Sequence, residues 1–546
     1  MQAPYEHFYM LNEFPSDQLT WRCWNGGNWG YDEGEKFVLS THTWTPEAKI
    51  INNAWTGSWK AIGLCNQLLY DLKDKTASDL SMTEEAFNEY IAEVRTLRAW
   101  SYYQVFELWG GIIPLNTKAA SETAELPMSE SKVKGSFEAG CQSIWDFLVT
   151  ELDESVDALP KNVNTRANQA MNRMLKARLL LNSKLFTGVD KFSDCKTLCE
   201  DIIGGKYGTY SVESDYHKVY DIGNENSSEV VFAYLCTRTM TPDTARNFRV
   251  GPFIPSSNAN DLFGYSDTRN GWNCVILVPS HDNSGTVLAE GGTDTGGVCF
   301  LDAPYNDKLG AIWERFDDRD IRKQAFHCDE TGKWDGLALK GAQFKYGTTE
   351  PYIADADRLD EPLVYVDQLG TFKQTNDVKL ETVMSPRWGE TNSGYRLVRY
   401  PIFPDAAGKD YFDISQVEFR ITEVIYMLAE CELRLSGNSN RAKELVNSVR
   451  GRYFNDASKD ALNVPGPGFT AFDLDWMLSE WGKEFLSEGC RRRTDLRRFD
   501  KFTQGQWWFF GRAEDYPAKR DRKYEWYPLP ASALRVNKGL EQNPNY

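Results

Sequence analysis

The residues best suited to ligand chemistry form an aromatic loop near the start of the chain. The segment WRCWNGGNWGYDEG, from Trp21 to Gly34, sets three Trp and one Tyr among Asn, Asp and Gly. A flat aromatic ring can stack on the apolar face of a sugar, while amides and carboxylates bond to its hydroxyls. Glycines let the backbone turn so that the rings face outward. The predicted carbohydrate-binding residues of this loop are Trp24, Asn28, Trp29 and Asp32.

The alternative for this loop is a segment folded beneath the neighbouring helices. We expect that alternative for Trp21, and we weigh the two equally for the two later Trp residues. The content of 18 Trp and 26 Tyr, within 13% aromatic residues, exceeds what core packing normally needs. Some of these rings should therefore be exposed, although most Trp residues are expected to fill a helical core.

Segments of the middle third combine the same residue types. DTRNGWNC and SPRWGETNSGYRLVRY mix aromatic rings with Arg and Asn, and GGVCFLDAPY lies between them. These segments belong to long loops, and long loops in compact domains commonly carry function. The predicted carbohydrate-binding residues here are Trp272, Cys299, Arg387, Trp388 and Tyr395.

Motifs typical of catalysis are missing from the sequence. GxSxG, HExxH, GxGxxG and GxxxxGK[ST] do not occur. A glycosidase needs only two suitably placed carboxylates, however, and the chain holds 79 acidic side chains. We predict no enzymatic activity and keep a surface glycoside hydrolase as the enzymatic alternative.

Metal-binding chemistry has few residues to draw on. The chain has five His, and its 11 Cys show no spacing typical of a zinc site or a disulfide framework. The acidic run from Asp317 to Asp320 lacks the Gly and terminal Glu of an EF-hand loop. We predict that no cofactor is required; a structural Ca²⁺ would leave no signature in these motifs.

Composition excludes several classes of protein. The formal charge of -18 repels polyanions, so nucleic acid is not an expected partner. Hydrophobic residues at 41% and charged residues at 26% are typical of an ordered globular protein. No apolar run is long enough to span a bilayer.

Helical periodicity dominates both ends of the chain. Apolar residues between Phe87 and Trp109 recur with a helical period, which predicts a long amphipathic helix. Antiparallel pairs of such helices suggest a tetratricopeptide-like arrangement. Tyr524 to Tyr546 is rich in Pro and reads as extended. Further helices are predicted at Trp55–Leu72, Phe137–Leu159, Ala167–Phe186, Val417–Leu435, Arg441–Tyr453 and Phe472–Leu486.

The middle of the chain, from Tyr207 to Lys409, is rich in Gly, Asn, Asp and Ser and loses this periodicity. It predicts long loops with short strands. Because helices at both ends flank this irregular middle, we expect one interwoven, mainly α fold. Its parts are an N-terminal part, 1–206, with the aromatic loop and helix pairs, and a C-terminal part, 207–546, with the loop-rich ligand region and closing helices.

Five segments of the sequence resemble, in order, the signature segments of the SusD/RagB family. They include AEVRTLRAWSYYQVFELWGGIIPL, WGKEFLSEGCRRRTDLRRFDKF and YPLPASALRVNKGLEQNPNY. Trp481 stands where the family usually has Arg. The five segments are Thr43–Asn66, Ala92–Leu115, Phe419–Asn438, Trp481–Phe502 and Tyr527–Tyr546.

The charged residues within these segments have the spacing of a structural network. Residues three or four apart share one helix face, and Arg forms strong bidentate pairs with carboxylates. We predict that they hold helices together in partly buried ion pairs and do not bind ligand. The residues concerned are Glu93, Arg95, Arg98, Glu488, Arg491, Arg492, Asp495 and Arg497.

The resemblance implies a SusD-like fold of tetratricopeptide-like helix pairs with a loop-rich face that holds glycan. It implies a non-catalytic nutrient-binding lipoprotein of the outer membrane, displayed at the cell surface. Such a protein captures oligosaccharide or polysaccharide and delivers it to a SusC-like TonB-dependent transporter. Export signal and lipidated Cys are expected upstream of Met1, so that the membrane is touched only through a lipid anchor.

A third class of function competes with the glycan-binding protein and the hydrolase. Tetratricopeptide-like helices also build scaffolds that bind peptides or proteins. Ring stacking does not distinguish one sugar from another, because specificity lies in hydroxyl contacts. The sequence therefore leaves the identity of the glycan open.

Overall fold

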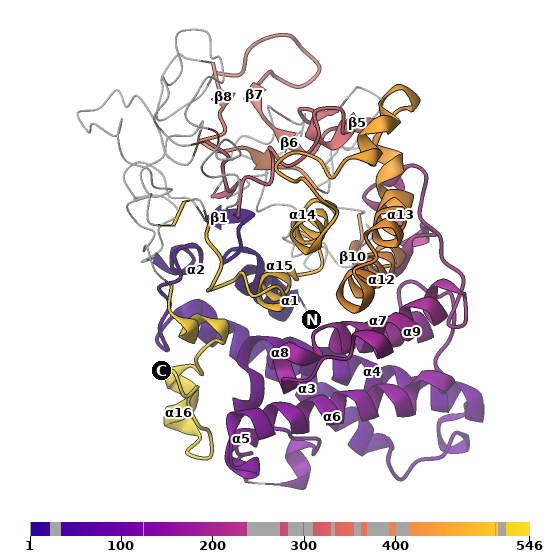
Figure 1. Ribbon diagram of the computed structural model, residues 1–546. Helices are drawn as coiled ribbons and strands as arrows, with labels where there is room; N and C mark the ends of the chain where they lie inside the picture. The colour runs from indigo at the N-terminus through magenta and orange to yellow at the C-terminus, as the bar shows by residue number, and fades with distance from the viewer. Residues whose placement is uncertain are drawn as a thin grey trace.

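The computed structural model describes residues 2–21, 34–123, 125–236, 262, 274–281, 299, 309–328, 333–353, 362–368, 393–399, 414–507, 509–510 and 520–546. Within these ranges the predicted mainly helical fold is confirmed (Figure 1). The longer helices are α1 (Gln2–Glu13), α3 (Lys49–Leu72), α4 (Glu84–Trp109), α6 (Phe137–Ser155), α7 (Gln169–Leu181), α9 (Phe192–Ile203), α12 (Ile421–Ser436), α13 (Ser439–Arg450) and α14 (Leu474–Glu484). The shorter ones are α2 (Phe37–Thr41), α5 (Glu130–Lys134), α8 (Ser183–Thr187), α15 (Arg492–Arg498) and α16 (Ala531–Val536).

Helices α3 to α9 gather in the lower half of the molecule (Figure 1). Helix α3 packs on α4, α4 on α6, α7 on α9, and α9 on α12, as expected for stacked helix pairs. Helix α4 begins three residues before Phe87, because Thr83 caps it: its hydroxyl accepts the backbone N–H of Ala86 at 3.2 Å. The predicted helix Ala167–Phe186 is divided at Asn182 into α7 and α8.

A glycine turn at the end of α4 brings it into close contact with α6. Gly110 has a φ of 62°, in the left-handed region. A Cβ atom on Gly111 would lie 2.1 Å from the backbone oxygen of Phe137 and 2.7 Å from the backbone nitrogen of Cys141. The absence of a side chain at this position therefore lets two backbones touch.

We expect Gly111→Ala to destabilise the fold by about 3 kcal/mol, because the new methyl group must displace backbone atoms of α6. The matched control is Gly63→Ala in α3, where a Cβ would meet nothing within 4 Å. That change should stabilise by up to about 1 kcal/mol, since Ala is the better helix former. Thermal unfolding followed by circular dichroism should shift in opposite directions for the two variants. Equal melting temperatures would contradict the close packing at Gly111.

Short antiparallel strand pairs, not a continuous sheet, make up the described β structure. The predicted loop-rich middle is confirmed, and β5 to β8 lie at the top of the molecule (Figure 1). The pairs are β1 (Leu19–Trp21) with β3 (Val275–Leu277), β2 (Val230–Tyr234) with β10 (Gln416–Arg420), β4 (His327–Cys328) with β5 (Trp334–Asp335), β6 (Ala338–Leu339) with β9 (Arg396–Leu397), and β7 (Gly341–Ala342) with β8 (Val364–Tyr365).

The prediction that a helix begins at Val417 is wrong, because residues 416–420 form strand β10. Val417 and Phe419 are fully buried in the core, and strand β2 supplies the hydrogen-bonding partner. Glu418 and Arg420 alternate with them and are buried in ion pairs. Polar and apolar residues do alternate along 416–420, which is the pattern of a strand, but the segment leads without a break into α12, and the predicted helix therefore included it.

The prediction of an extended C-terminal segment is wrong in part. Residues 522–525 form the 3-10 helix η14 (Arg522–Glu525), and residues 531–536 form α16 directly after Pro530. Proline is well tolerated at a helix start, where no N–H is needed. The segment returns to the N-terminal half, since the indole N–H of Trp109 donates to the carbonyl of Pro528 at 2.9 Å.

The predicted ion-pair network is confirmed in the interior. Arg95 and Arg98 both bind Glu151, and Arg491 binds Asp495 at 3.0 Å. At its centre four guanidinium groups and four carboxylates alternate, all buried. They are Arg322, Arg399, Arg420 and Arg452, with Asp320, Glu229, Glu484 and Glu488.

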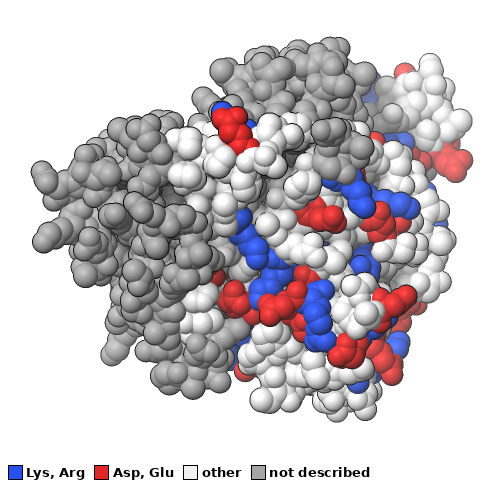
Figure 2. Space-filling model, turned by 90° about the horizontal axis from the view of Figure 1, so that it is seen from above, with Lys and Arg blue, Asp and Glu red and all other residues white. Residues whose placement is uncertain are grey.

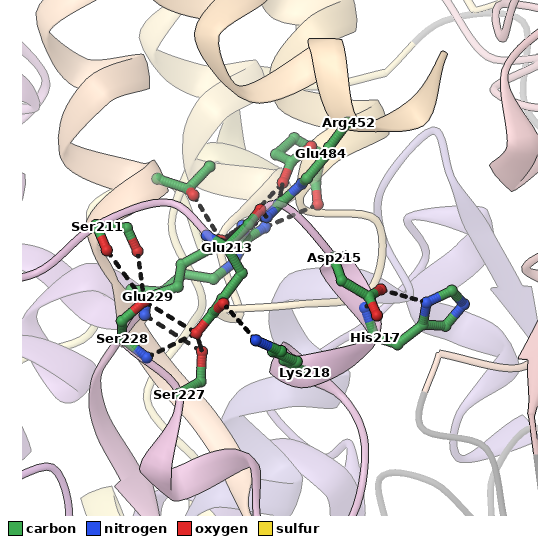
Figure 3. A network of polar contacts seen from close by, with 12 residues as sticks. Ser211, Glu213, Asp215, His217, Lys218, Ser227, Ser228, Glu229, Arg452 and Glu484 are labelled. Carbon is green, nitrogen blue, oxygen red and sulfur yellow. Dashed lines mark hydrogen bonds and ion pairs between the residues drawn. The ribbon is translucent and has the colours of Figure 1, made fainter. Parts of the chain in front are cut away.

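Figure 3 shows part of this network, where Arg452 bonds to both Glu229 and Glu484. Glu229 lies directly before β2, and Glu484 lies at the end of α14, so the network joins segments far apart in sequence. Arg178 of α7 likewise pairs with Glu423 of α12 at 2.6 Å. Such contacts link the N-terminal and C-terminal parts, while their division at residue 206 stays a prediction.

Candidate ligand-binding site

Most of the predicted carbohydrate-binding residues lie outside the described residues. These are Trp24, Asn28, Trp29, Asp32, Trp272, Arg387 and Trp388. Their roles stay predictions. The expectation that Trp21 packs inside is confirmed: its side chain is 1% exposed and its ring contacts Phe14, with 5.5 Å between centroids.

Tyr395 lies in the core at the start of strand β9. Its side chain is 4% exposed, and its ring packs edge-on against Trp313 at 5.5 Å. Its carbonyl accepts the backbone N–H of Leu277 at 3.0 Å, which fixes the segment against β3. A ring so deeply buried offers little face for a sugar, so its burial does not support the predicted role in binding.

Cys299 lies beside a histidine and a carboxylate. It forms a β-bridge with His281, whose Nδ1 lies 3.2 Å from an oxygen of Asp367. Burial alone lowers the pKa of His281, but hydrogen bonds with Asp367 and Cys299 raise that pKa to about 11. Both contacts therefore favour the protonated form of the imidazole. The cluster is an ion pair that joins three loop segments.

An unperturbed imidazole titrates between about pH 5 and 8. We expect the ring protons of His281 to show no titration in this range in a two-dimensional NMR experiment. Asp367→Asn should restore a midpoint near neutrality. The ion pair contributes stability fully below the unfolded pKa of 6.5, and this contribution is lost as pH rises toward about 11. A midpoint near 6.5 in the native protein would contradict this arrangement.

A cleft of about 870 Å³ opens in the loop-rich region beside strands β4, β6 and β7. Its volume falls in the upper part of the range for ligand sites. Aromatic and hydrogen-bonding side chains share its walls. They are Phe326, Phe344 and Tyr346, with His327, Lys340, Gln343, Lys345, Thr348 and Thr349.

The ring of Phe344 is the exposed aromatic surface of this cleft. Its side chain is 46% exposed, whereas a buried phenylalanine would be expected in an ordinary core. The segment that carries it forms a hairpin-like arm, in which Lys345 N–H donates to the carbonyl of Glu350 at 3.0 Å and Gly347 has a φ of 66°. This turn places the ring at the cleft edge, near hydroxyl and ammonium groups.

This arm is not among the segments predicted from the sequence to bind carbohydrate. Its sequence, GAQFKYGTTEP from Gly341 to Pro351, mixes aromatic, polar and glycine residues, as the predicted loops do. It lacks Trp, on which that prediction depended. Its composition therefore resembles that of the predicted binding loops, but less clearly.

The surface at the loop-rich end of the molecule carries both positive and negative side chains. Figure 2 shows Lys and Arg next to Asp and Glu across its described part, not a field of one sign. A long-range attraction for a polyanion is therefore not built into this surface. Specific contacts must provide recognition here.

None of the helices described is both long and apolar enough to cross a membrane. No three or more His, Cys, Asp or Glu side chains in the described ranges gather as a set that could hold a metal ion.

Comparison with known proteins gives consistent results. The chain is 22% identical over 552 residues to the starch-binding protein SusD of Bacteroides thetaiotaomicron, covering 99% of this chain and 86% of that protein. Among solved structures, the surface glycan-binding protein A of the same genus and species, in complex with laminarihexaose, superposes with a TM-score of 0.61 at 17% identity, covering 98% of this chain and 94% of that one. NanU of B. fragilis gives 0.62 at 18% identity, covering 100% and 94%.

The family model matches the larger part of the chain. It spans residues 228–546, which hold strands β2 to β10, the cleft, the central ion-pair network and the closing helices. The five ordered segments of the sequence and the confirmed helical fold agree with it. This chain belongs to the SusD family.

Proposed function

We propose that this chain is a cell-surface glycan-binding protein, which captures an oligosaccharide or polysaccharide and passes it to a SusC-like TonB-dependent transporter of the outer membrane. It acts by binding and not by catalysis. A lipid anchor would hold it at the membrane.

The observation that carries this proposal is the cleft at the loop-rich face. It combines an exposed ring, Phe344, with amide, hydroxyl and ammonium groups in a volume of about 870 Å³. Sugar recognition needs this pairing, because the apolar face of the sugar stacks while its hydroxyls form hydrogen bonds. The cleft is wide enough for several sugar units.

Relatives support the same ligand class. One is named a starch-binding protein, and a solved neighbour is a surface glycan-binding protein in complex with laminarihexaose. The proposed transporter and outer-membrane location rest on family membership and on the segments that resemble the SusD/RagB family.

Native gel electrophoresis in gels that contain plant, microbial or host polysaccharides tests the ligand class, with released reducing sugar assayed in parallel. We expect one polysaccharide to retard the protein with no sugar released. Released sugar would instead indicate that the protein is a glycoside hydrolase. No retardation by any polysaccharide would favour a peptide-binding or scaffold role.

The transporter is tested separately. Affinity purification of the chain from outer membranes of its own source, solubilised in mild detergent, should recover a TonB-dependent barrel in a stoichiometric amount. Recovery of the chain alone, at salt and detergent conditions that keep it folded, would argue against a stable complex.

A further inference from the structure

Three cysteines meet in the core where helix α9 packs on α12 (Figure 1). Cys195 and Cys199 lie on α9, and Cys431 lies on α12, and all three side chains are fully buried. The sulfur atoms of Cys195 and Cys199 lie 3.9 Å apart. The Cys195 thiol also lies 3.5 Å from the carbonyl oxygen of Ala177 on α7. Neither the ion-pair network nor the cleft accounts for this cluster.

Contacts between α9 and α12 fix how their cysteines face each other. Lys196 and Glu432, which directly follow a cysteine on each helix, pair at 2.8 Å. The guanidinium of Arg434 lies 4.9 Å from the ring of Phe192, and these residues stand three positions after and three positions before the same two cysteines. Partners therefore run in opposite directions along the two helices. The first cysteine of α9 thus lies opposite the cysteine of α12.

The opposed thiols are in direct contact and are held in their protonated form. Hydrogen bonding to Cys195, and then burial, raises the pKa of the Cys431 thiol above its ordinary value. A hydrogen bond with Cys199, together with burial, raises the pKa of the Cys195 thiol. Disulfide exchange needs a thiolate, so the packed cluster reacts slowly with oxidants and reductants alike. Its redox state is therefore set before α9 and α12 have packed.

Disulfide geometry favours a bond across the two helices over a bond within one. The two Cβ atoms of a disulfide lie about 3.5–4.5 Å apart. Residues four apart on one helix, such as Cys195 and Cys199, hold their Cβ atoms about 5–6 Å apart, so a bond between them would distort α9. Cysteines that face each other across packed helices need only a rotation of their side chains.

We propose that Cys195 and Cys431 form a disulfide that links α9 to α12 when the chain folds in the presence of a disulfide oxidant, and that Cys199 stays a free thiol. The oxidant is a small-molecule disulfide or a thiol–disulfide oxidoreductase. One cysteine thiolate attacks the oxidant and forms a mixed disulfide, which the second thiolate then resolves. One S–S bond forms in the chain, two thiol protons pass to solvent, and two electrons reduce the oxidant's disulfide to two thiols.

The consequence of this bond is a long closed loop. Positions 195 and 431 are more than two hundred residues apart, and the whole loop-rich middle of the chain lies between them. A long closed loop restricts the unfolded chain strongly, so the bond should stabilise the fold. It concerns the helical scaffold and does not depend on which ligand the protein binds.

Peptide mapping of the full chain tests the linkage. The chain is produced with an export signal in a bacterial host, where a periplasmic thiol–disulfide oxidoreductase acts during folding, and in the same host without that enzyme. Free thiols are alkylated, and the protein is digested with trypsin without reduction. Because Lys196 separates Cys195 from Cys199, the tryptic peptides 192–196 and 197–206 report on the two cysteines separately.

We expect peptide 192–196 to be linked to peptide 421–434, which carries Cys431, in protein from the host that has the oxidoreductase. Peptide 197–206 should carry an alkylated thiol. Protein from the host without the enzyme should carry alkylated thiols on all three peptides. The linked form should melt about 3 °C higher than the reduced form, as expected for one disulfide in a chain of this size.

Two variants separate the bond from general effects on the core. Cys195→Ala should abolish the difference in melting temperature between protein from the two hosts. Cys199→Ala is the matched control, since Cys199 lies on the same helix and is equally buried. It should keep the difference. The peptide map of the unmodified chain needs no variant, so the test stands if either variant fails to fold.

The map distinguishes the outcomes directly. Alkylated thiols on both 192–196 and 421–434, in protein from the host with the oxidoreductase, would overturn the bond. A link from 197–206 to either of these peptides would overturn the proposed pairing. Loss of the difference in melting temperature in Cys199→Ala, with its retention in Cys195→Ala, would also contradict the pairing.

Discussion

Replacing Glu484 by Gln should lower the free energy of unfolding by about 3 to 5 kcal/mol, the cost of breaking a buried ion-pair network. Glu484 accepts hydrogen bonds from Arg420 at 2.8 Å, Arg452 at 3.0 Å and Arg322 at 3.1 Å. The change to Gln preserves size and removes the charge. The three guanidinium groups then remain buried with too few carboxylates.

Urea unfolding followed by tryptophan fluorescence measures this change. The matched control is Glu444→Gln on α13, whose side chain is 64% exposed and pairs with Arg441 at 3.4 Å. Exposed pairs contribute about 0 to 1 kcal/mol, so the control should unfold nearly with the unmodified chain. Similar urea midpoints for both variants would show that the central network is not the source of stability proposed here.

The same residue predicts a specific acid sensitivity. Burial alone would raise the pKa of Glu484, but Arg420, Arg452 and Arg322 lower that pKa to about 2, from 4.5 in the unfolded chain. A depressed carboxyl pKa gives stability that is present above pH 4.5 and is lost as pH falls toward 2. As pH falls from 4.5 to about 2, the melting temperature of Glu484→Gln should therefore fall less steeply than that of the unmodified chain. An identical slope in both proteins would contradict the assignment.

Phe344→Ala should weaken binding of the retained polysaccharide by about 10- to 30-fold, as expected when a central aromatic contact of about 2 kcal/mol is lost. The ring is 46% exposed at the edge of the cleft, so its removal should leave the melting temperature nearly unchanged. Phe344→Tyr keeps the stacking face and should retain most of the affinity. Affinity is measured by retardation as a function of polysaccharide concentration in native gels.

Ile353→Ala is the matched control for the cleft. Ile353 is 44% exposed two residues after the end of this arm, and it is not among the residues that line the cleft. Its truncation removes a similar apolar side chain without touching the proposed site. Equal loss of affinity in both variants would point to a general effect on the arm, and unchanged affinity in Phe344→Ala would place the glycan elsewhere.

Local pattern determined much of the architecture. The 3.6-residue period between Phe87 and Trp109 predicted α4, because a helix that packs on one side needs apolar residues on that side. Runs of Gly, Asn and Asp predicted a middle of loops and short strands. The charged residues around Arg491 and Asp495 predicted a partly buried ion-pair network between helices, and Arg491 does pair with Glu423 of α12 at 2.8 Å.

Local pattern failed where distant segments decided the outcome. Residues 416–420 are a strand because β2, nearly two hundred residues earlier, supplies its hydrogen bonds. Tyr395 has the composition of a binding loop, yet it is buried because Trp313, about eighty residues earlier, packs against its ring. Exposure of a ring depends on what packs against it, and that partner is not written next to it in the chain.

By itself the sequence determined the family, the helical scaffold and the types of residue in its network and loops. Only the tertiary structure decided which carboxylate each arginine meets, which aromatic rings face solvent, and where cavities form. The cleft at Phe344 is lined by residues between Ala325 and Thr349 together with Leu262, and only folding shows that these side chains surround a cavity. The periodicity of apolar residues predicts which side of one helix or strand is buried, whereas a binding site is formed by side chains from several elements.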